Sequence, residues 1–384
     1  MHKLCFVSGS RAEYGLLRPV IEKFIHEKSV ESKLIVTGSH LSAAYGNTVE
    51  EILKDSLVEL ITIPIPLEMD DKASMGITTG IALEKFSSLF LTYKPDLVVV
   101  LGDRFEIFAA CVAAYLLSIP IAHISGGDVT EGAVDDALRN CITKMSYLHF
   151  PGCEQSRQRI IQMGEHPSRV FNVGELGVEN CLKTSFMTRA ELAKDLCFDY
   201  IKQDYSVVTF HPVTMEANTE EGQLYELIEA LDCFDMGFVI TMANADSGGR
   251  KINDIWKKER LKRNNWYLTT SLGTLRYLSV LKYAKAVIGN SSSGIFEAPV
   301  LKTPTVNIGD RQKGRSMPNS VVSCAPLKES IVEAISKVID PQFCRIFESM
   351  DIPFGNGRTS DLIFKHIIDF FFKRNIEPKV FYEL

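Results

Sequence analysis

The sequence lacks the usual marks of zinc proteins, nucleic-acid-binding proteins and membrane proteins. Its nine cysteines are scattered without a C-x-x-C pair, which argues against zinc and for reduced thiols in a cytosol. The 42 basic and 48 acidic residues give a net charge of -6 and no basic tract stands out, so no nucleic-acid partner is expected. The apolar runs end before they reach membrane-spanning length, and the run in MHKLCFVSGS is too short for a signal peptide. We therefore expect a cytoplasmic protein that does not enter a membrane.

The dinucleotide-binding pattern G-x-G-x-x-G is also absent from the loop after the first predicted strand. That loop, SGSRAEYG at 8–15, still offers small residues and Arg11 in front of a helix. Backbone amides at a helix N-terminus, together with a guanidinium, suit an anionic group. Many first strand–helix turns have this form, so the loop by itself specifies no ligand.

What the chain does contain is a regular alternation of strands and helices over 384 residues, a length that suits two domains. This alternation predicts an α/β protein with two parallel sheets and a domain border after residue 180. The predicted strands are 3–7, 32–37, 60–65, 97–101, 119–124, 147–150, 205–210, 237–242, 266–268, 286–289 and 303–307, and the main predicted helices are 16–26, 76–93, 105–117, 154–163, 182–196, 224–233, 275–283, 330–339 and 362–372.

The segment from Asp96 to Met145 carries most of the chemistry in the first half. Acidic and basic side chains follow two buried strands there, and a further acidic pair opens the next helix. In open parallel sheets, ligands bind at the carboxyl ends of the strands, so we expect these side chains to form a site. The alternative for Asp135 alone is a helix-start carboxylate that pairs with Arg139 four residues on. The charged residues concerned are Asp103, Arg104, Asp128, Glu131, Asp135 and Asp136.

The second half has features that suit a nucleotide. The loop GNSSSG at 289–294 joins a strand to a helix, and its amides and hydroxyls suit a diphosphate. The alternative is a serine loop that only caps the helix. Glu297 lies in the first turn, where a carboxylate can accept hydrogen bonds from two ribose hydroxyls, and His211 follows a strand end.

With these motifs assembled, the chain resembles the hydrolysing nucleotide-sugar 2-epimerases, which act on UDP-N-acetylglucosamine and related sugars. The resemblance spans nearly the whole chain, in order and in spacing. It rests on SGSRAEYG (8–15), GDRFE (102–106), GGDVTEGAVDDALRNCITKMSYLHF (126–150), TFHPVT (209–214), GNSSSGIFEAP (289–299), NIGDRQKGR (307–315) and PFGNGR (353–358).

The resemblance implies an α/β fold of two Rossmann-like domains, arranged as in type B glycosyltransferases, with the active site in the cleft between them. Residues 1–180 would carry the catalytic carboxylates and residues 181–361 the nucleotide site. Residues 362–384 would form a C-terminal helix that packs back on the first domain. The resemblance also implies a homo-oligomer, a dimer or a tetramer.

The resemblance further implies a reaction in which H2 of the sugar is removed while UDP leaves C1, and water then adds to the glycal. Such a reaction needs carboxylates as base and acid and cations for the leaving diphosphate. No cofactor or metal is expected, because arginine and histidine supply the positive charge. By motif position, the catalytic residues would be Asp103 and Asp135 with Glu131 and Asp136 nearby, the diphosphate ligands Arg11, Arg104, His211, Ser291 and Ser292, and the nucleoside ligands Asn244, Glu297 and Arg311.

One departure from the family pattern bears on the substrate. Several relatives have a catalytic glutamate at the position of Ser125. With serine there, the chain is more similar to the branch that acts on UDP- or GDP-linked N,N'-diacetylbacillosamine on the way to legionaminic acid. The open alternatives are UDP-N-acetylglucosamine on the way to sialic acid, a glycosyltransferase, a non-hydrolysing epimerase and a nucleotide-sugar-binding sensor. The acidic cluster argues against a glycosyltransferase, and the RAEYG and DRQKGR motifs argue for the hydrolysing branch.

Overall fold

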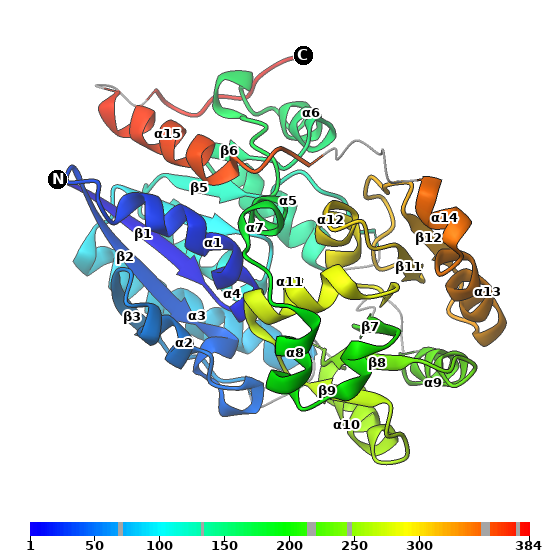
Figure 1. Cartoon of the computed structure of the whole chain (residues 1–384). Coiled ribbons are helices and arrows are strands. Elements are labelled where there is room, and N and C mark those ends of the chain that lie inside the picture. The colour runs from blue at the N-terminus through cyan, green and yellow to red at the C-terminus, as the bar shows by residue number, and fades with distance from the viewer. Residues whose placement is uncertain (68–71, 132–133, 213–219, 244–247, 347–353, 374–376) are drawn as a thin grey trace. The chain divides into compact units, whose positions relative to one another are not determined.

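The computed structural model (Figure 1) describes residues 1–67, 72–131, 134–212, 220–243, 248–346, 354–373 and 377–384. The chain divides into two compact units. The first consists of residues 1–128, 134–180 and 354–384, and the second of residues 129–133 and 181–353. The sequence predicts a domain border after residue 180 and a return of the chain to the first domain at residue 362. In the structure the returning segment begins at Phe354.

The first unit is built on a sheet of six parallel strands in the order β3-β2-β1-β4-β5-β6. Alternate side chains of β1 belong to two different apolar cores. Leu4 and Phe6 pack into one core, and Cys5 and Val7 pack into the other. Because successive side chains of a strand point to opposite faces, both faces of this sheet are covered. The strands are β1 His2–Ser8, β2 Val30–Thr37, β3 Glu59–Ile63, β4 Leu97–Leu101, β5 Ile121–Ile124 and β6 Leu148–Phe150.

Helices follow the strands and form the two layers that cover this sheet. The continuous apolar character of the strands requires such cover, since every residue of β4 is buried. The helical segments are α1 Arg11–Phe24, η1 Gly38–Leu41, η2 Ala43–Tyr45, α2 Val49–Asp55, α3 Lys72–Tyr93, α4 Phe105–Leu116, α5 Asp135–Met145, α6 Glu154–Gln162, η3 Pro167–Arg169, α7 Leu176–Lys183 and α15 Thr359–Phe372.

The helix α15 returns from the far end of the chain and lies against α1, as Figure 1 shows. Ile363 and Ile367 enter the same apolar core as Phe6 of β1. The rings of Phe24 and Phe364 lie 4.8 Å apart, and Lys23 forms an ion pair with Asp361 at 2.6 Å. This returning helix is therefore an integral layer of the first unit.

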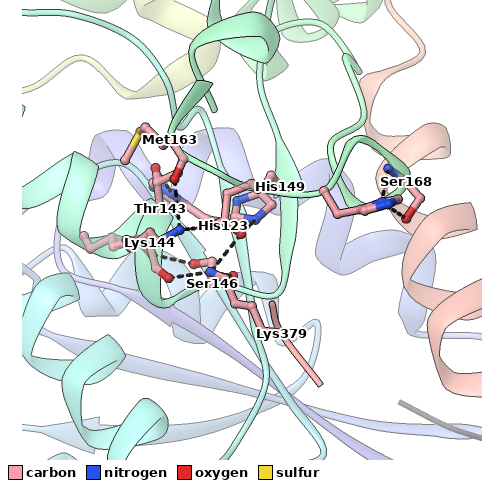
Figure 2. Close-up of polar contacts among 11 residues, drawn as sticks. His123, Thr143, Lys144, Ser146, His149, Met163, Ser168 and Lys379 are labelled. Carbon is pink, nitrogen blue, oxygen red and sulfur yellow. Dashed lines mark hydrogen bonds and ion pairs between the residues drawn. The ribbon is translucent and has the colours of Figure 1, made fainter. Parts of the chain in front are cut away.

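The segment after α15 is held by a partly buried polar network next to α5 and β6 (Figure 2). The Lys379 ammonium donates to the carbonyls of Ser146, at 2.6 Å, and Lys144, and it pairs with Glu165 at 2.9 Å. The Glu165 carboxylate also accepts hydrogen bonds from His149 Nε2 at 3.2 Å and from the Lys144 ammonium at 2.8 Å. Burial alone would raise the pKa of Glu165, but these hydrogen bonds lower it to about 2.

The second unit repeats the architecture with six parallel strands in the order β12-β11-β10-β7-β8-β9. Val208 of β7 packs into one core and Val207 into another, so this sheet is also covered on both faces. The strands are β7 Tyr205–Thr209, β8 Gly237–Thr241, β9 Trp266–Thr269, β10 Val287–Gly289, β11 Thr305–Ile308 and β12 Val321–Cys324, and the helices are α8 Arg189–Leu196, η4 Asp199–Lys202, α9 Glu220–Leu231, α10 Gly249–Arg260, α11 Gly273–Tyr283, α12 Ser293–Val300, α13 Lys328–Val338 and α14 Pro341–Ile346.

The two parallel sheets with flanking helices confirm the predicted α/β class. The prediction missed α2, α10, α14 and the edge strand β12, and it placed one helix at 182–196 where the structure has the two helices α7 and α8. It also started α1 too late, at residue 16. The helix begins at Arg11 because Ser10 caps it by accepting from the Glu13 amide, and Gly15 is tolerated inside. Among the described residues, no helix has the length and apolar character needed to cross a membrane.

Three buried histidines of the first unit predict that stability falls in mild acid. Burial lowers the pKa of His40 and His123 from 6.5 to about 4, and burial also lowers the pKa of His149 although Glu165 opposes it. Below pH 6.5 the unfolded chain therefore binds protons that the folded chain does not. The contribution of these histidines to the free energy of unfolding is therefore fully present above pH 6.5. It is lost progressively toward pH 4, by on the order of 3 kcal/mol for each of His40 and His123.

Urea unfolding between about pH 7.5 and about pH 4.5 measures this loss. The variant His40→Gln should have a shallower pH dependence than the native chain, whereas His26→Gln, at an exposed position, should not. Equal slopes for the native chain and His40→Gln would show that His40 does not contribute.

Candidate active site

His123 of β5 fixes the turn at the carboxyl end of β4. Gly102 has φ +77°, which opens a tight turn before Asp103. The His123 Nε2 lies 2.8 Å from the Gly102 carbonyl, and its Nδ1 lies 3.1 Å from the Thr143 hydroxyl (Figure 2). Because a carbonyl can only accept, Nε2 carries the proton and Nδ1 accepts from Thr143. The neutral ring therefore holds the Gly102 turn against β5 and α5.

Asp103 forms an ion pair with a buried arginine. The Arg139 Nε donates to Asp103 Oδ2 at 2.8 Å, and Nη2 donates to the same oxygen. Arg139 is 2% exposed, so its charge needs a partner. Burial alone would lower the pKa of Arg139, but Asp103, Asp128 and Asp136 raise it. Asp103 is consequently held as a carboxylate at the end of β4.

The same guanidinium organises the segment after β5. Its Nη1 donates to the Asp128 carbonyl at 2.8 Å and lies 3.5 Å from Asp136 Oδ1. Asp128 also accepts from the Ser156 hydroxyl at 2.7 Å. Asp135 is the first residue of α5 and is half-buried. Arg139 therefore pairs over a long range with Asp103, beyond the local pairing expected for a helix start.

Glu131 belongs with the second unit, where its amide donates to the Lys313 carbonyl at 3.2 Å. Its carboxylate pairs with the Lys313 ammonium at 3.4 Å and is about half exposed. The structure thus brings Asp103, Asp128 and Asp136 together around Arg139, and joins Glu131 to the 308–315 loop.

Arg104 is engaged by two buried glutamates. Its Nε lies 2.7 Å from Glu106 Oε1 and 3.7 Å from Glu13 Oε1. Burial raises the pKa of Glu13, and the neighbouring Glu106 raises it further while Arg104 lowers it. A Cβ at Gly9 would lie 2.3 Å from Glu106 Oε1, so glycine there leaves room for the pair. Arg11, the first residue of α1, forms an ion pair with Glu51 at 3.0 Å.

In the second unit, the Asn290 side chain ties two strand ends together. Its Oδ1 accepts from the His211 amide at 2.7 Å and its Nδ2 donates to the His211 carbonyl at 2.8 Å. Asn290 is fully buried and His211 is 6% exposed. The preceding Gly289 has φ +134°, and a Cβ there would lie 1.9 Å from the Thr209 carbonyl oxygen. Only glycine therefore allows the strands to approach so closely beside His211.

The serine loop begins α12, and Glu297 within this helix has one unsatisfied carboxylate oxygen. Ser291 accepts from the Ser293 amide at 3.3 Å, and Ser293 accepts from the Tyr277 hydroxyl at 2.7 Å. These two serines therefore stabilise the turn itself. The Glu297 Oε2 is buried and has no hydrogen-bond partner among the described residues, and burial raises the pKa of Glu297. A buried acceptor of this kind suits a hydroxyl donor from a ligand.

The 308–315 loop covers the Asn290 backbone. The Arg311 Nη1 donates to the Asn290 carbonyl at 3.0 Å, and the buried Gln312 donates to it at 2.8 Å. Arg311 is therefore fixed next to the serine loop. Asn244 lies outside the described residues. No cluster of three or more histidine, cysteine, aspartate or glutamate side chains suited to a metal occurs in the described part of the chain.

Several residues that shape this site were not singled out from the sequence. Arg139 was read only as a local helix partner, and the roles of Glu13, Glu106 and Asn290 were not predicted. The signal was present, because Glu106 lies in GDRFE and Asn290 in GNSSSG. It was not specific, because each of these residues acts through partners far away in the sequence.

The chain matches known proteins over most of its length. Residues 22–368 match the family model described as UDP-N-acetylglucosamine 2-epimerase. The chain is 40% identical over 322 residues to a GDP/UDP-N,N'-diacetylbacillosamine 2-epimerase (hydrolyzing) of Campylobacter jejuni subsp. jejuni, covering 83% of each chain. It is 36% identical over 390 residues to the polysialic acid biosynthesis protein P7 of Escherichia coli, covering 100% of this chain and 98% of that protein.

The fold is also similar to that of a solved UDP-GlcNAc 2-epimerase from Neisseria meningitidis bound to UDP-GlcNAc. The TM-score is 0.78 at 19% identity, covering 96% of this chain and 100% of that chain. The chain has two parallel six-stranded sheets, with charged side chains at the carboxyl edge of the first. Because residues 22–368 also match the family model, the chain belongs to the UDP-N-acetylglucosamine 2-epimerase family.

Proposed function

We propose that this protein is a hydrolysing 2-epimerase of nucleotide sugars. Its substrate would be UDP- or GDP-N,N'-diacetylbacillosamine, and its products free 2,4-diacetamido-2,4,6-trideoxymannose and the nucleoside diphosphate. The 40% identity to the Campylobacter enzyme supports this substrate. The observation that carries the proposal is Asp103, held ionised by the buried Arg139 at the carboxyl end of β4. The product would supply legionaminic acid synthesis.

The reaction would proceed in two steps. A carboxylate removes H2 while the C1–O bond breaks, the electron pair leaves with the diphosphate, and a C1=C2 glycal forms. Water then adds to C1 and a proton is delivered to the opposite face of C2. Asp103 and Asp135, with Asp136 beside Arg139, are the proposed acid–base residues. His211, Ser291, Ser292, Arg11 and Arg104 are proposed for the diphosphate, and Glu297, Arg311 and Asn244 for the nucleoside.

The second candidate is the conversion of UDP-N-acetylglucosamine to N-acetylmannosamine and UDP for sialic acid synthesis. The 36% identity to a polysialic acid biosynthesis protein favours it. A type B glycosyltransferase and a nucleotide-sugar-binding protein are weaker candidates, because the acidic cluster around Asp135 argues against the first and a binding protein needs no acid–base carboxylate. We further propose a cytoplasmic homo-oligomer, and the nine free cysteines are consistent with a reducing compartment.

One incubation separates these candidates. The protein is mixed with each nucleotide sugar in turn, and free nucleoside diphosphate and free sugar are followed by NMR. A hydrolysing epimerase releases both, with inverted configuration at C2 of the sugar. Return of a nucleotide-linked epimer, transfer to an added acceptor, or binding without turnover would each reject the proposal in favour of a different class.

Removing either proposed catalytic carboxylate should reduce turnover without abolishing nucleotide binding. We expect Asp103→Asn and Asp135→Asn each to lose about 10²–10⁴-fold in kcat, the range for a removed general acid or base. Asp103→Asn also leaves Arg139 buried without its carboxylate, which is expected to destabilise the fold by roughly 3–5 kcal/mol. Activity is therefore measured per folded enzyme.

Asp96→Asn is the matched control. Asp96 precedes β4 at its other end, where its carboxylate accepts from the Lys3 amide at 2.8 Å, and it is about half exposed. Its turnover should stay close to the native value. Near-native turnover in both Asp103→Asn and Asp135→Asn would remove the carboxylate mechanism.

Substitutions at the diphosphate side should weaken binding of UDP as well as turnover. His211→Ala and Ser292→Ala remove groups proposed to contact UDP in the ground state and in the transition state alike. Isothermal titration with UDP measures the loss. Ser336→Ala, which changes an exposed serine of α13, serves as the control. Unchanged affinity in both test variants would mean that the serine loop only caps α12.

The proposed substrate implies a preference for the diacetamido-trideoxy sugar over N-acetylglucosamine. A pocket built for a 6-methyl group must desolvate the 6-hydroxyl of N-acetylglucosamine, and this costs binding free energy. We expect kcat/KM to favour the diacetamido-trideoxy sugar by on the order of 10–200-fold. A ratio in favour of UDP-N-acetylglucosamine would reassign the enzyme to N-acetylmannosamine formation.

A further inference from the structure

Three charged side chains meet at the carboxyl edge of the first sheet where the strand order reverses. β1 and β4 are neighbours there, and the chain continues from them toward opposite edges of the sheet. In open parallel sheets the ligand crevice lies outside the strand ends at such a point. Glu13 follows β1 in α1, and Arg104 and Glu106 follow β4. This trio of Glu13, Arg104 and Glu106 therefore stands where the fold favours a ligand.

The trio has two carboxyl groups for one guanidinium. The Arg104 Nε donates to Glu106 Oε1 at 2.7 Å, whereas its distance to Glu13 Oε1 is 3.7 Å. Glu106 is fully buried and Glu13 is 6% exposed. The closer ion pair is therefore between Arg104 and Glu106, and Glu13 is a second, buried carboxyl group beyond hydrogen-bond distance of the Arg104 Nε.

Glu13 has one bound oxygen and one unsatisfied oxygen. Its Oε2 accepts from the Gly9 amide at 2.7 Å. Its Oε1 is buried and has no hydrogen-bond partner among the described residues. An unsatisfied buried carboxylate is costly, and a proton on the group removes its charge. Burial raises the pKa of Glu13 and the Glu106 charge raises it further, while Arg104 lowers it. Burial and charge thus both favour the neutral acid.

Two further ionisable groups flank Glu13, and neither neutralises it. His40 of η1 is fully buried, and burial lowers its pKa to about 4, so its ring is uncharged near neutral pH. Arg11, at the start of α1, forms an ion pair with Glu51 of α2 at 3.0 Å. Arg104 is therefore the cation that acts on Glu13.

Two glycines leave room for the trio. A Cβ at Gly9 would lie 2.3 Å from Glu106 Oε1, and a Cβ at Gly38 would lie 2.8 Å from the same oxygen. Gly38 also has φ +59°, and its Cβ would lie 2.7 Å from the Gly9 carbonyl oxygen. The ends of β1 and β2 are thus shaped around the Glu106 carboxylate, so the cluster of charges is part of the fold.

We propose that Glu13 is a positioning residue for the substrate diphosphate, and that it acts as a neutral acid which leaves the Arg104 charge to the diphosphate. With the proton in place, the trio has no net charge. Without the proton the trio is negative and repels the diphosphate. Binding of a diphosphate should therefore draw a proton onto Glu13 whenever the pH has removed it. This inference rests on the proposed function, in which Arg104 contacts the diphosphate.

The affinity for UDP as a function of pH tests this role. Isothermal titration with UDP is run between about pH 7 and about pH 9, in buffers with different ionisation enthalpies, which gives the number of protons taken up. We expect the native chain to lose affinity by up to about tenfold per pH unit once Glu13 ionises, and to take up as much as about one proton per UDP.

The variant Glu13→Gln keeps the shape of the neutral acid and cannot ionise. It should bind UDP with native affinity at the lower end of the pH range, and it should lose both the fall in affinity and the additional proton uptake. Glu106→Gln provides a second test, because Glu13 can then stay ionised beside Arg104 without making the trio negative. Its proton uptake should also fall below the native value.

Glu22→Gln is the matched control, since it makes the same change on α1 at a half-exposed ion pair with Arg18. It should keep the native pH dependence and proton uptake. The same pH dependence in Glu13→Gln as in the native chain, or an equal loss of affinity at every pH, would overturn the proposal. If the native chain binds no UDP at any pH, the proposed function fails as well, whereas native binding with an unaltered Glu13→Gln profile rejects only the role of Glu13.

Discussion

The ion pair between Asp103 and the buried Arg139 is the constraint on which the first unit's charged edge depends. A buried guanidinium must be neutralised, and here the carboxylates come from Asp103 at the end of β4 and Asp136 in α5, while the Asp128 carbonyl accepts a further hydrogen bond. One arginine therefore fixes the position of three acidic residues and keeps Asp103 ionised. A proton-transfer site needs such fixed charges, because they are aligned before the substrate arrives.

His123, Gly102 and Gly152 also help to fix the polar groups at this edge of the sheet. His123 holds the Gly102 turn through a neutral ring, and Gly152 leaves room for the Glu175 carboxylate. In the second unit, Asn290 holds His211 by its backbone, so the position of the imidazole is set by the strand ends. In both units the carboxyl ends of parallel strands carry the polar groups, as expected for an α/β fold.

The sequence predicted the elements whose signal is local. The run Leu97–Leu101 is continuous and apolar, and its predicted bounds are those of β4. The edge strand β12 is only partly buried and produced no clear apolar pattern. The helix α10 was missed because it is polar on average, although Ile252, Ile255 and Trp256 form a buried apolar face at helical spacing. Gly15 suggested a loop, yet the cap at Ser10 starts α1 before it.

The geometry of the site could not be predicted in the same way, because it depends on distant pairs. Arg139 pairs with Asp103 across 36 positions, Ser125 with Glu175 across 50, and His211 with Asn290 across 79. Motif spacing shows that such residues are present. It does not show which carboxylate neutralises which cation, and it gave no indication that Glu131 pairs with Lys313.

The central claim, elimination followed by rehydration, is tested most directly by the isotope content of the products. The reaction is run in deuterium oxide and, separately, in 18O-labelled water. The account predicts one deuterium at C2 of the released sugar and no 18O in the nucleoside diphosphate, because the C1–O bond breaks. Retained hydrogen at C2 together with 18O in the diphosphate would contradict it, since that result describes hydrolysis at phosphorus without epimerisation.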